Sequence, residues 1–398
     1  MSAALPALEG GTPVRDGAPV PFFQAALSEA DIAAVTAVLR GGWLTLGPVT
    51  AEFESACAAW LGTPHAVALS SCTAALFLAL RAAEIGPGHE VIVPALTFPA
   101  TVHVIRHVGA EPVLADIELD SFGLDPGEVE ALLGPRTRAL MPVDYAGHPS
   151  RLTELLEICR RRGIVCVEDA AHAFGAAHDG QRIGTVSDIT AFSFYATKCI
   201  TTGEGGLLAC RDADFAQRVR LLGYHGMQRD AWKRYTDQGS WYYEIELPGY
   251  KCNMTDVQAA LGLSQLQRAE ALRDARARVA SMYTEAFATE RDLLLPATRS
   301  GALHAWHLYV VRLRTEGLRV GRDHFAGALR AEGIVPSVHF IPYHQQPAGR
   351  SLELRRPLPR TEQFAAQCLS LPLYPSMSDS DVADVVEAVR KLLRYYAR

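Results

Sequence analysis

The stretch Ile164-Val-Cys-Val-Glu-Asp-Ala-Ala-His172 decides the fold class of this chain of 398 residues. Its first half is an apolar run of the length of a buried strand, and the polar Asp169 follows at once. Similar apolar runs alternate with helical stretches along the chain. The predicted strands are residues 66–69, 90–94, 112–116, 139–143, 164–168, 189–194 and 206–209. This alternation predicts an α/β fold with a mainly parallel sheet, because parallel crossovers place helices on both faces.

Outside this sheet, the pattern divides the chain into two regions. Residues 28–40 are predicted to form an amphipathic helix, and residues 248–272 a turn followed by a helix with Thr255 as its N-cap. Beyond about residue 270, longer helices and antiparallel-looking strands such as residues 306–313 take over. We therefore predict a large domain over residues 1–270, which includes the N-terminal segment, and a smaller C-terminal α/β domain over residues 271–398.

Composition excludes several classes of protein. The net charge is −6 and no basic block is present, which argues against a nucleic-acid partner. No apolar stretch approaches the roughly 18 to 20 residues of a membrane span, and residues 1–21 lack the pattern of a secretory signal, so we expect a cytoplasmic protein without a membrane partner. The eight cysteines form no CxxC pair, and His103 and His107 lack the glutamate of an HExxH site. We predict no disulfide framework and no metal.

Lysine is rare in this chain, with only four among the 38 basic residues. One of them, Lys198, lies in Phe192-Ser-Phe-Tyr-Ala-Thr-Lys-Cys-Ile200, directly after a predicted strand. An amine held among apolar residues has a lowered pKa and becomes a nucleophile that can condense with an aldehyde. An ordinary surface lysine at a strand end is the alternative, and the neighbouring motifs decide between the two.

Polar and aromatic residues follow other predicted strands at the same edge of the sheet, where open α/β sheets bind ligands. Asp169 can pair with a protonated pyridine nitrogen, or act as a turn residue. His172 can hydrogen bond to a phenolic oxygen of the same ring, or be structural. Residues 70–75 open a predicted helix and suit a phosphate, although plain N-capping explains them too. Phe98 can stack on the ring or be a core aromatic.

Together these residues and other motifs resemble the DegT/StrS-type nucleotide-sugar aminotransferases, which are fold-type-I pyridoxal-phosphate enzymes with an aspartate-aminotransferase-like fold. The matching segments are residues 42–48, 71–75, 168–176, 193–198, 249–256 and 339–344, in the family's order. The resemblance implies catalytic roles for Lys198, which carries pyridoxal 5'-phosphate as a Schiff base, and for Asp169, which pairs with the pyridinium nitrogen. The other residues that it places at the cofactor are Cys72, Thr73 and Ser193 at the phosphate, His172 near the phenolic oxygen and Phe98 on the ring.

The resemblance also implies a homodimer with shared active sites. A residue of the segment 249–256 then reaches the partner's cofactor phosphate, and we predict Asn253, with Lys251 as the alternative. Relatives that dehydrate sugars have histidine at position 198, so the lysine favours transamination, with glutamate as the expected donor and pyridoxamine 5'-phosphate as the intermediate.

Residues 224–235 and 239–243 resemble the branch that aminates C4 of a nucleotide-linked 4-keto-6-deoxyhexose. We predict dTDP-4-keto-6-deoxyglucose as the substrate, in a pathway to an amino sugar for a secondary metabolite or a surface glycan. The candidates on the substrate side are Arg229, Tyr235, His339 and His344. A 3-keto sugar or a cyclitol remains the alternative substrate. A pyridoxal-phosphate lyase and a non-catalytic, cofactor-binding regulatory protein are the alternative functions.

Overall fold

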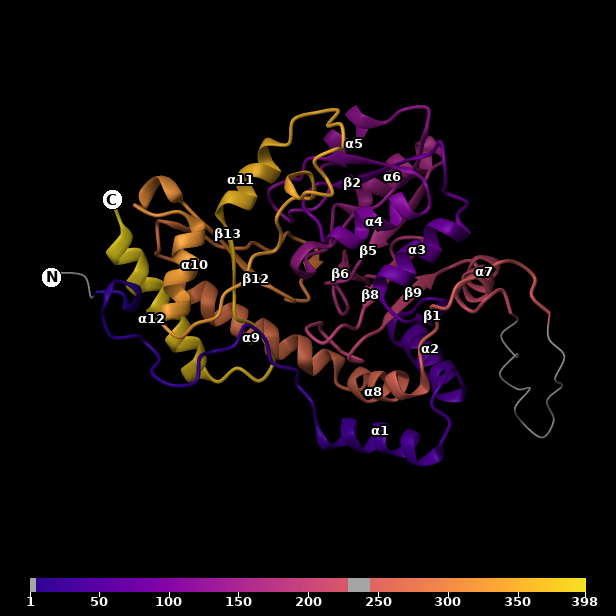
Figure 1. Ribbon diagram of the computed structural model, residues 1–398, viewed down its shortest axis with the longest axis horizontal. Coiled ribbons are helices and arrows are strands. Elements are labelled where there is room, and N and C mark those ends of the chain that lie inside the picture. The colour runs from indigo at the N-terminus through magenta and orange to yellow at the C-terminus, as the bar shows by residue number, and fades with distance from the viewer. Residues whose placement is uncertain (1–4, 228–243) are drawn as a thin grey trace.

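The computed structural model describes residues 5–227 and 244–398 (Figure 1). Its central feature is a seven-stranded sheet with the strand order β1-β9-β8-β5-β4-β2-β3. The strands are β1 (His65–Leu69), β2 (Glu90–Pro94), β3 (Glu111–Ala115), β4 (Thr137–Leu140), β5 (Val165–Asp169), β8 (Ile189–Ser193) and β9 (Gly206–Cys210). Neighbours from β3 to β8 pair in parallel, whereas β9 is antiparallel to both β1 and β8. The prediction of a mainly parallel sheet is confirmed.

All seven predicted strands are present, with ends that differ by three residues or fewer. The sequence pattern does not reveal that β9 runs against the others. A parallel crossover needs a connection of about a dozen or more residues, usually with a helix. The connection from β8 to β9 has no helix, and it returns the chain directly beside β8. This irregular connection carries Lys198.

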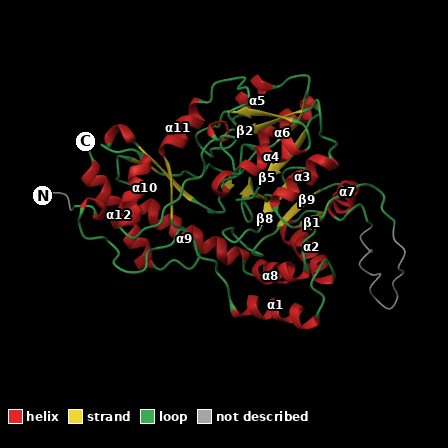
Figure 2. Cartoon of the chain, viewed as in Figure 1, coloured by secondary structure: helices red, strands yellow, loops and turns green. Residues whose placement is uncertain are grey.

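Helices cover both faces of the large sheet (Figure 2). One face packs against α3 (Cys72–Ala82), α4 (Pro99–His107) and α7 (Ala213–Gly223). The opposite face packs against α2 (Pro48–Leu61), α5 (Pro126–Leu132), α6 (Leu152–Arg162) and α8 (Asp256–Leu266). Alternate residues of a strand therefore enter different cores, as Val91 and Ile92 do. Burial on both faces explains why these strands are continuous apolar runs.

Two helices begin after capping side chains, and one of these, Thr255, is the N-cap that the sequence predicts. Ser28 caps α1 (Glu29–Gly41), and its hydroxyl accepts from the backbone N–H of Asp31 while the Asp31 carboxylate accepts from that of Ser28. Thr255 caps α8 in the same reciprocal way with Gln258. The predicted helix up to residue 272 is wrong at its end, because α8 stops at Leu266 and a separate helix, α9 (Ala269–Phe287), follows.

The rest of the chain surrounds a second, antiparallel sheet with the order β10-β12-β13. Its elements are β10 (Leu293–Leu294), β12 (Tyr309–Leu313), β13 (Cys368–Leu371), α9, α10 (Arg322–Ala331), α11 (Pro359–Gln367) and α12 (Asp379–Tyr396). Val20 joins the core of this region, so the N-terminal segment crosses to it. The division at residue 270 stays a prediction.

Short elements complete the described chain. They are β6 (Ala177–His178), β7 (Gln181–Arg182), β11 (Ala302–Leu303), η1 (Ala7–Glu9), η2 (Tyr145–Gly147), η4 (Thr315–Gly317) and η5 (Tyr343–Gln345). Within residues 5–227 and 244–398, none of the helices combines the length and the apolar character that a membrane crossing requires.

Candidate active site

A cavity of about 530 Å³ lies where several strands of the large sheet end. Residues from α3, from the loops after β5 and β8, and from the segment 337–340 line it. The predicted site residues that line it are Cys72, Thr73, Phe98, Asp169, His172, Ser193, Lys198 and His339. The fold thus brings together residues that are up to 267 positions apart in the sequence, from 72 to 339.

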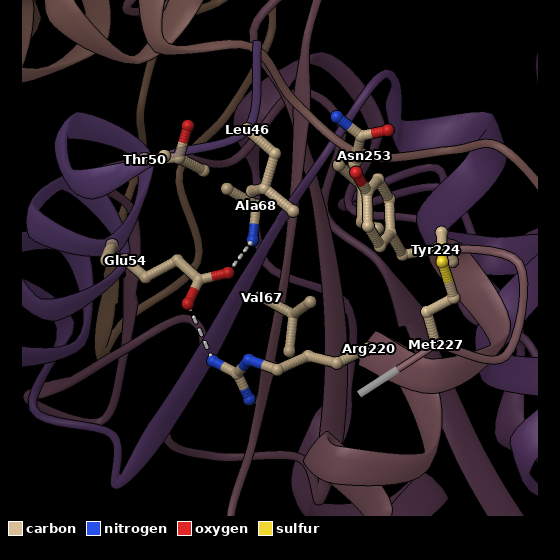
Figure 3. Close-up of a pocket in the computed structure, with 13 residues that line it drawn as sticks. Leu46, Thr50, Glu54, Val67, Ala68, Arg220, Tyr224, Met227 and Asn253 are labelled. Atoms are coloured by element: carbon tan, nitrogen blue, oxygen red, sulfur yellow. Dashed lines mark hydrogen bonds and ion pairs between the residues drawn. The ribbon is translucent and has the colours of Figure 1, made fainter. Parts of the chain in front are cut away.

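Two of the remaining predicted residues, Asn253 and His344, are described by the structure and do not line this cavity. Asn253 lies beside a separate small cavity of about 50 Å³ (Figure 3), where its Oδ1 accepts from Nζ of Lys251 over 2.5 Å. His344 places Nε2 3.3 Å from Oε1 of Glu362 instead. Arg229 and Tyr235 lie outside the described residues.

Lys198 lies on the loop after β8 and is half-buried at the wall of the cavity. Burial is the main reason that its pKa is lowered to about 8, and the buried charge of Arg276 lowers it further. About a tenth of the amine is therefore neutral at pH 7, far more than for an ordinary lysine, and the neutral amine is the form that attacks an aldehyde.

Asp169 ends β5, and both of its carboxylate oxygens have donors. Thr101 donates its hydroxyl to Oδ2 over 2.8 Å, the backbone N–H of Ala171 donates to Oδ1 over 3.1 Å, and the thiol of Cys72 lies 3.9 Å from Oδ1. Burial raises the pKa of Asp169, whereas these donors and Lys198 favour the carboxylate. The carboxylate can therefore pair with the protonated pyridine nitrogen of a ring that binds in the cavity.

The first turn of α3 forms a concave wall of the same cavity. Ser71 caps the helix by accepting from the backbone N–H of Ala74 over 3.1 Å, and Cys72 and Thr73 follow in the first turn. Gly206 of β9 crosses so closely that a Cβ there would lie 2.2 Å from the carbonyl carbon of Ser71. This close approach, the free N–H groups of the helix end and the Ser193 hydroxyl fit a phosphate group.

Three imidazoles meet at another wall. Burial lowers the pKa of His172, His307 and His339, in the case of His339 to about 4, so all three are neutral near pH 7. The ring of His172 lies 4.4 Å from that of His307, and its Nδ1 accepts from the backbone N–H of Ala146 over 3.2 Å. The proton of His172 is therefore on Nε2.

Sequence reasoning missed several residues of the cavity, above all Thr101 and His307. Thr97 precedes α4 and Thr101 lies in its first turn, and this pair of hydroxyls beside Phe98 is a signal that points to Asp169 once the strand order is known. His307 has no such signal, because it belongs to the distant segment before β12.

The sequence profile of the DegT/DnrJ/EryC1/StrS aminotransferase family matches residues 25–390. The chain belongs to this family. The spore coat polysaccharide biosynthesis protein SpsC of Bacillus subtilis is 45% identical over 378 residues, which are 94% of this chain and 97% of SpsC.

Solved structures extend the likeness to three dimensions. The putative sugar aminotransferase Spr1654 of Streptococcus pneumoniae, in its pyridoxamine-phosphate form, has a TM-score of 0.88 and 34% identity, and the match covers 94% of this chain and 98% of Spr1654. A pyridoxal-phosphate form of Spr1654 matches equally well. DesI, solved in the presence of its TDP-sugar product, has a TM-score of 0.87 and 32% identity over 98% of this chain and 96% of DesI.

These findings confirm the predicted family, fold type, enzyme class and cofactor. The chain is a sugar aminotransferase of the DegT/DnrJ/EryC1/StrS family that uses pyridoxal phosphate, and the cavity that holds Lys198 and Asp169 is its candidate active site. Among the described residues, no group of three or more His, Cys, Asp or Glu side chains could hold a metal ion.

Proposed function

We propose that this aminotransferase aminates C4 of a nucleotide-linked 4-keto-6-deoxy sugar, with dTDP-4-keto-6-deoxyglucose as acceptor and glutamate as donor. The observation that carries the proposal is the meeting of Lys198, Asp169 and the first turn of α3 in one cavity. The volume of about 530 Å³ lies within the range of small-molecule sites. DesI, which was solved with its TDP-sugar product, supports a deoxythymidine diphosphate as the carrier.

The residues of the cavity divide the work of the transfer. Pyridoxal phosphate, when bound, supplies an aldehyde that accepts the donor's nitrogen and a ring that acts as an electron sink. Nζ of Lys198 binds the cofactor and moves the proton between reacting carbons as general acid and base. The Asp169 carboxylate holds the proton on the ring nitrogen, and Nε2 of His172 donates to the phenolic oxygen. Thr73 and Ser193, with the first turn of α3, hold the phosphate.

The acceptor sugar binds on the side of His339. This imidazole lines the cavity, and its Nδ1 is fixed 2.8 Å from the Ser370 hydroxyl. Arg229 and Tyr235, which lie outside the described residues, remain proposed sugar contacts. His344 is also a proposed contact, although it contacts Glu362 and does not line the cavity.

We also propose that a second copy of the chain completes the site. Phe98 lines the cavity and yet is 57% exposed, and Tyr195 is 46% exposed in the same way. Large aromatic side chains at the mouth of a ligand site are typical of a surface that a partner covers. Asn253, which lies outside the cavity of its own chain, then reaches the phosphate in the partner's cavity. We place the enzyme in the cytoplasm, where it would supply an amino sugar for a secondary metabolite or a surface glycan.

The half-reaction is tested by absorption spectroscopy. Purified protein with pyridoxal phosphate is expected to show a visible band that glutamate removes, and a Lys198→Ala variant is expected to lack the band. A band that glutamate leaves unchanged would favour a cofactor-binding regulatory protein. Elimination products in place of an aminated sugar would favour a lyase.

The substrate is tested by mass spectrometry of product mixtures. With dTDP-4-keto-6-deoxyglucose and glutamate, we expect the mass of the amino sugar, and nuclear magnetic resonance should place the nitrogen on C4. Faster amination of a 3-keto sugar or a cyclitol would replace the proposed substrate without affecting the half-reaction.

Shared sites are tested by mixing two inactive variants, Lys198→Ala and Asn253→Ala. If Asn253 acts in the partner's site, a mixed dimer has one intact site, and activity should return after subunit exchange. If Asn253 acts within its own chain, both sites of the mixed dimer stay defective. The same experiment with Lys251→Ala in place of Asn253→Ala tests the alternative residue, because only a variant of the residue that contacts the partner's phosphate should be inactive alone and complement Lys198→Ala.

A further inference from the structure

Arg276 of α9 is a buried cation without an anionic partner. The core-facing positions of this helix include Ala269, Leu272, Val279 and Tyr283, and Arg276 takes its place in the same series with only 4% of its surface exposed. Within the described part of the chain, it forms no ion pair, and its Nε has no hydrogen-bond partner. Because an unpaired buried charge is costly, its retention in a core position calls for a function.

Among the described residues, the guanidinium hydrogen bonds only to backbone carbonyl groups, and these come from both parts of the chain. Nη2 donates to the carbonyl oxygens of Thr197 over 3.4 Å and Lys198 over 3.3 Å. Nη1 donates to those of His307 over 3.5 Å and Leu373 over 3.1 Å. The planar, rigid fork of arginine suits such a set of acceptors. One side chain thus fixes the loop that carries Lys198 against the segments before β12 and after β13.

The same charge acts on the amine of Lys198. Burial lowers the pKa of Lys198 most, and Arg276 lowers it in the same direction. The groups that act against this effect are Cys72 on α3, Asp169 on β5 and Cys199 beside the lysine. The histidines whose pKa values Lys198 helps to lower are His172, His307 and His339, all neutral near pH 7. Arg276 is therefore the permanent positive charge among these named neighbours.

We propose that Arg276 is a positioning residue for Lys198, which holds the loop of the reactive amine by its carbonyl groups and adds a buried positive charge that favours the neutral form of the amine. A cationic neighbour is one of the established ways in which a lysine becomes a nucleophile near neutral pH. The inference rests on the role proposed for Lys198, because a neutral amine is needed only where this lysine combines with the cofactor.

Competitive labelling of the apoprotein with acetic anhydride tests this inference without using activity. The reagent modifies neutral amines, and mass spectrometry of a digest compares Lys198 with Lys251, whose pKa depends on burial and not on Arg276. In an Arg276→Gln variant, which keeps donors and loses the charge, we expect the labelling rate of Lys198 relative to Lys251 to fall roughly three- to fivefold at pH 7. An Arg276→Lys variant, which keeps the charge, should stay within about twofold of the unsubstituted protein.

The outcomes separate the possibilities. An unchanged Lys198 to Lys251 ratio in a folded Arg276→Gln protein overturns the proposal, and so does an equal loss in both variants, since that would show a purely structural role. If Arg276→Gln does not fold, the unsubstituted apoprotein still decides. If Lys198 of the unsubstituted apoprotein is labelled at the same rate as the lysine of a free peptide of residues 195–201 at every pH, the protein does not lower the pKa of this amine, and the proposal is overturned. Failure of the proposed function itself would show separately, as a missing visible band with pyridoxal phosphate.

Discussion

The hydroxyl of Thr101 donates to Oδ2 of Asp169 over 2.8 Å, and both side chains are buried beside the cavity. Thr97 lies one turn earlier, with its hydroxyl 2.7 Å from that of Thr101. Since Thr101 also contacts the carbonyl oxygen of Phe98, its hydroxyl is held in place and aims at the carboxylate. Asp169 is thereby fixed in orientation before a cofactor binds, which limits the loss of entropy on binding.

We expect a Thr101→Val variant to hold pyridoxal phosphate more weakly. The substitution keeps the shape of the side chain and removes one hydrogen bond to a charged group, which contributes about 1.5–3 kcal/mol. Cofactor titration followed by absorbance should show roughly a tenfold or larger rise in Kd. Thr101→Ser, which keeps the hydroxyl, is the control and should bind within a few-fold of the unsubstituted protein. Equal Kd values in all three proteins would show that the hydrogen bond does not position Asp169 for binding.

A second pair of residues lies directly behind Asp169. Asp144 and Glu168 are fully buried, and their carboxyl groups lie close enough to affect each other's pKa. Among the described residues, one oxygen of each, Oδ2 of Asp144 and Oε1 of Glu168, has no donor. Carboxylates are acceptors only, so such a pair requires a shared proton. Burial raises the pKa of both groups, which fits this requirement.

Stability is therefore expected to fall as the pH rises. A carboxyl whose pKa is raised in the folded state binds its proton more tightly there than in the unfolded chain, so its stabilisation is complete at acid pH and is lost as the pH rises through the folded-state pKa. Glu168→Gln replaces the shared proton with a permanent amide donor. The variant should show a flatter dependence of Tm on pH above the ordinary pKa of a carboxyl group, whereas Glu168→Ala should lose about 1–3 kcal/mol at all pH values. Parallel profiles for Glu168→Gln and the unsubstituted protein would rule out the shared proton.

The contact between Gly206 and the first turn of α3 predicts a steric effect. A Cβ at position 206 would lie 2.2 Å from the carbonyl carbon of Ser71 and 2.4 Å from the nitrogen of Cys72, both of them backbone atoms. Gly206→Ala should therefore push α3 away from β9, lower Tm and weaken cofactor binding. Gly327→Ala is the control, because its Cβ would meet no atom within 4 Å in the middle of α10, where alanine stabilises by about 0.5–1 kcal/mol. Normal cofactor binding by Gly206→Ala would contradict the close approach as a requirement of the site.

The sequence predicts those parts of the site that stand at the ends of strands. Asp169 and the first turn of α3 each follow an apolar run, and the edge of a parallel sheet brings such positions together. Lys198 is one of only four lysines, and its place after a strand together with the neighbouring motifs singled it out. Residues that join the site through tertiary packing carry no such mark. Arg276 stands between Arg273 and Arg278, and only the helix phase separates it from them.

The antiparallel β9 shows a second limit. Apolar runs of similar length predict strands without their direction, and the direction depends on the connection. The loop between β8 and β9 is irregular because it carries Lys198 into the cavity, and the local pattern of residues 195–205 does not disclose this course. Asn253 is a related case, since it lies outside the cavity that holds Lys198 and its proposed role depends on a second chain.

Glu54 and Arg220 form an ion pair in the wall of the small cavity in Figure 3, and the last prediction concerns this pair. Oε2 of Glu54 accepts from Arg220 of α7 over 2.8 Å, and Oε1 accepts from the backbone N–H of Ala68 in β1 over 3.0 Å. Glu54→Ala leaves both donors without this acceptor in a buried place, and we expect a loss of about 3–5 kcal/mol in the free energy of unfolding. Glu84→Ala is the matched control. Glu84 is exposed and pairs with Arg218, which lies on α7 like Arg220, and such an exposed pair contributes about 0–1 kcal/mol. Chemical denaturation of both variants measures the difference, and equal losses would mean that burial does not set the strength of these pairs.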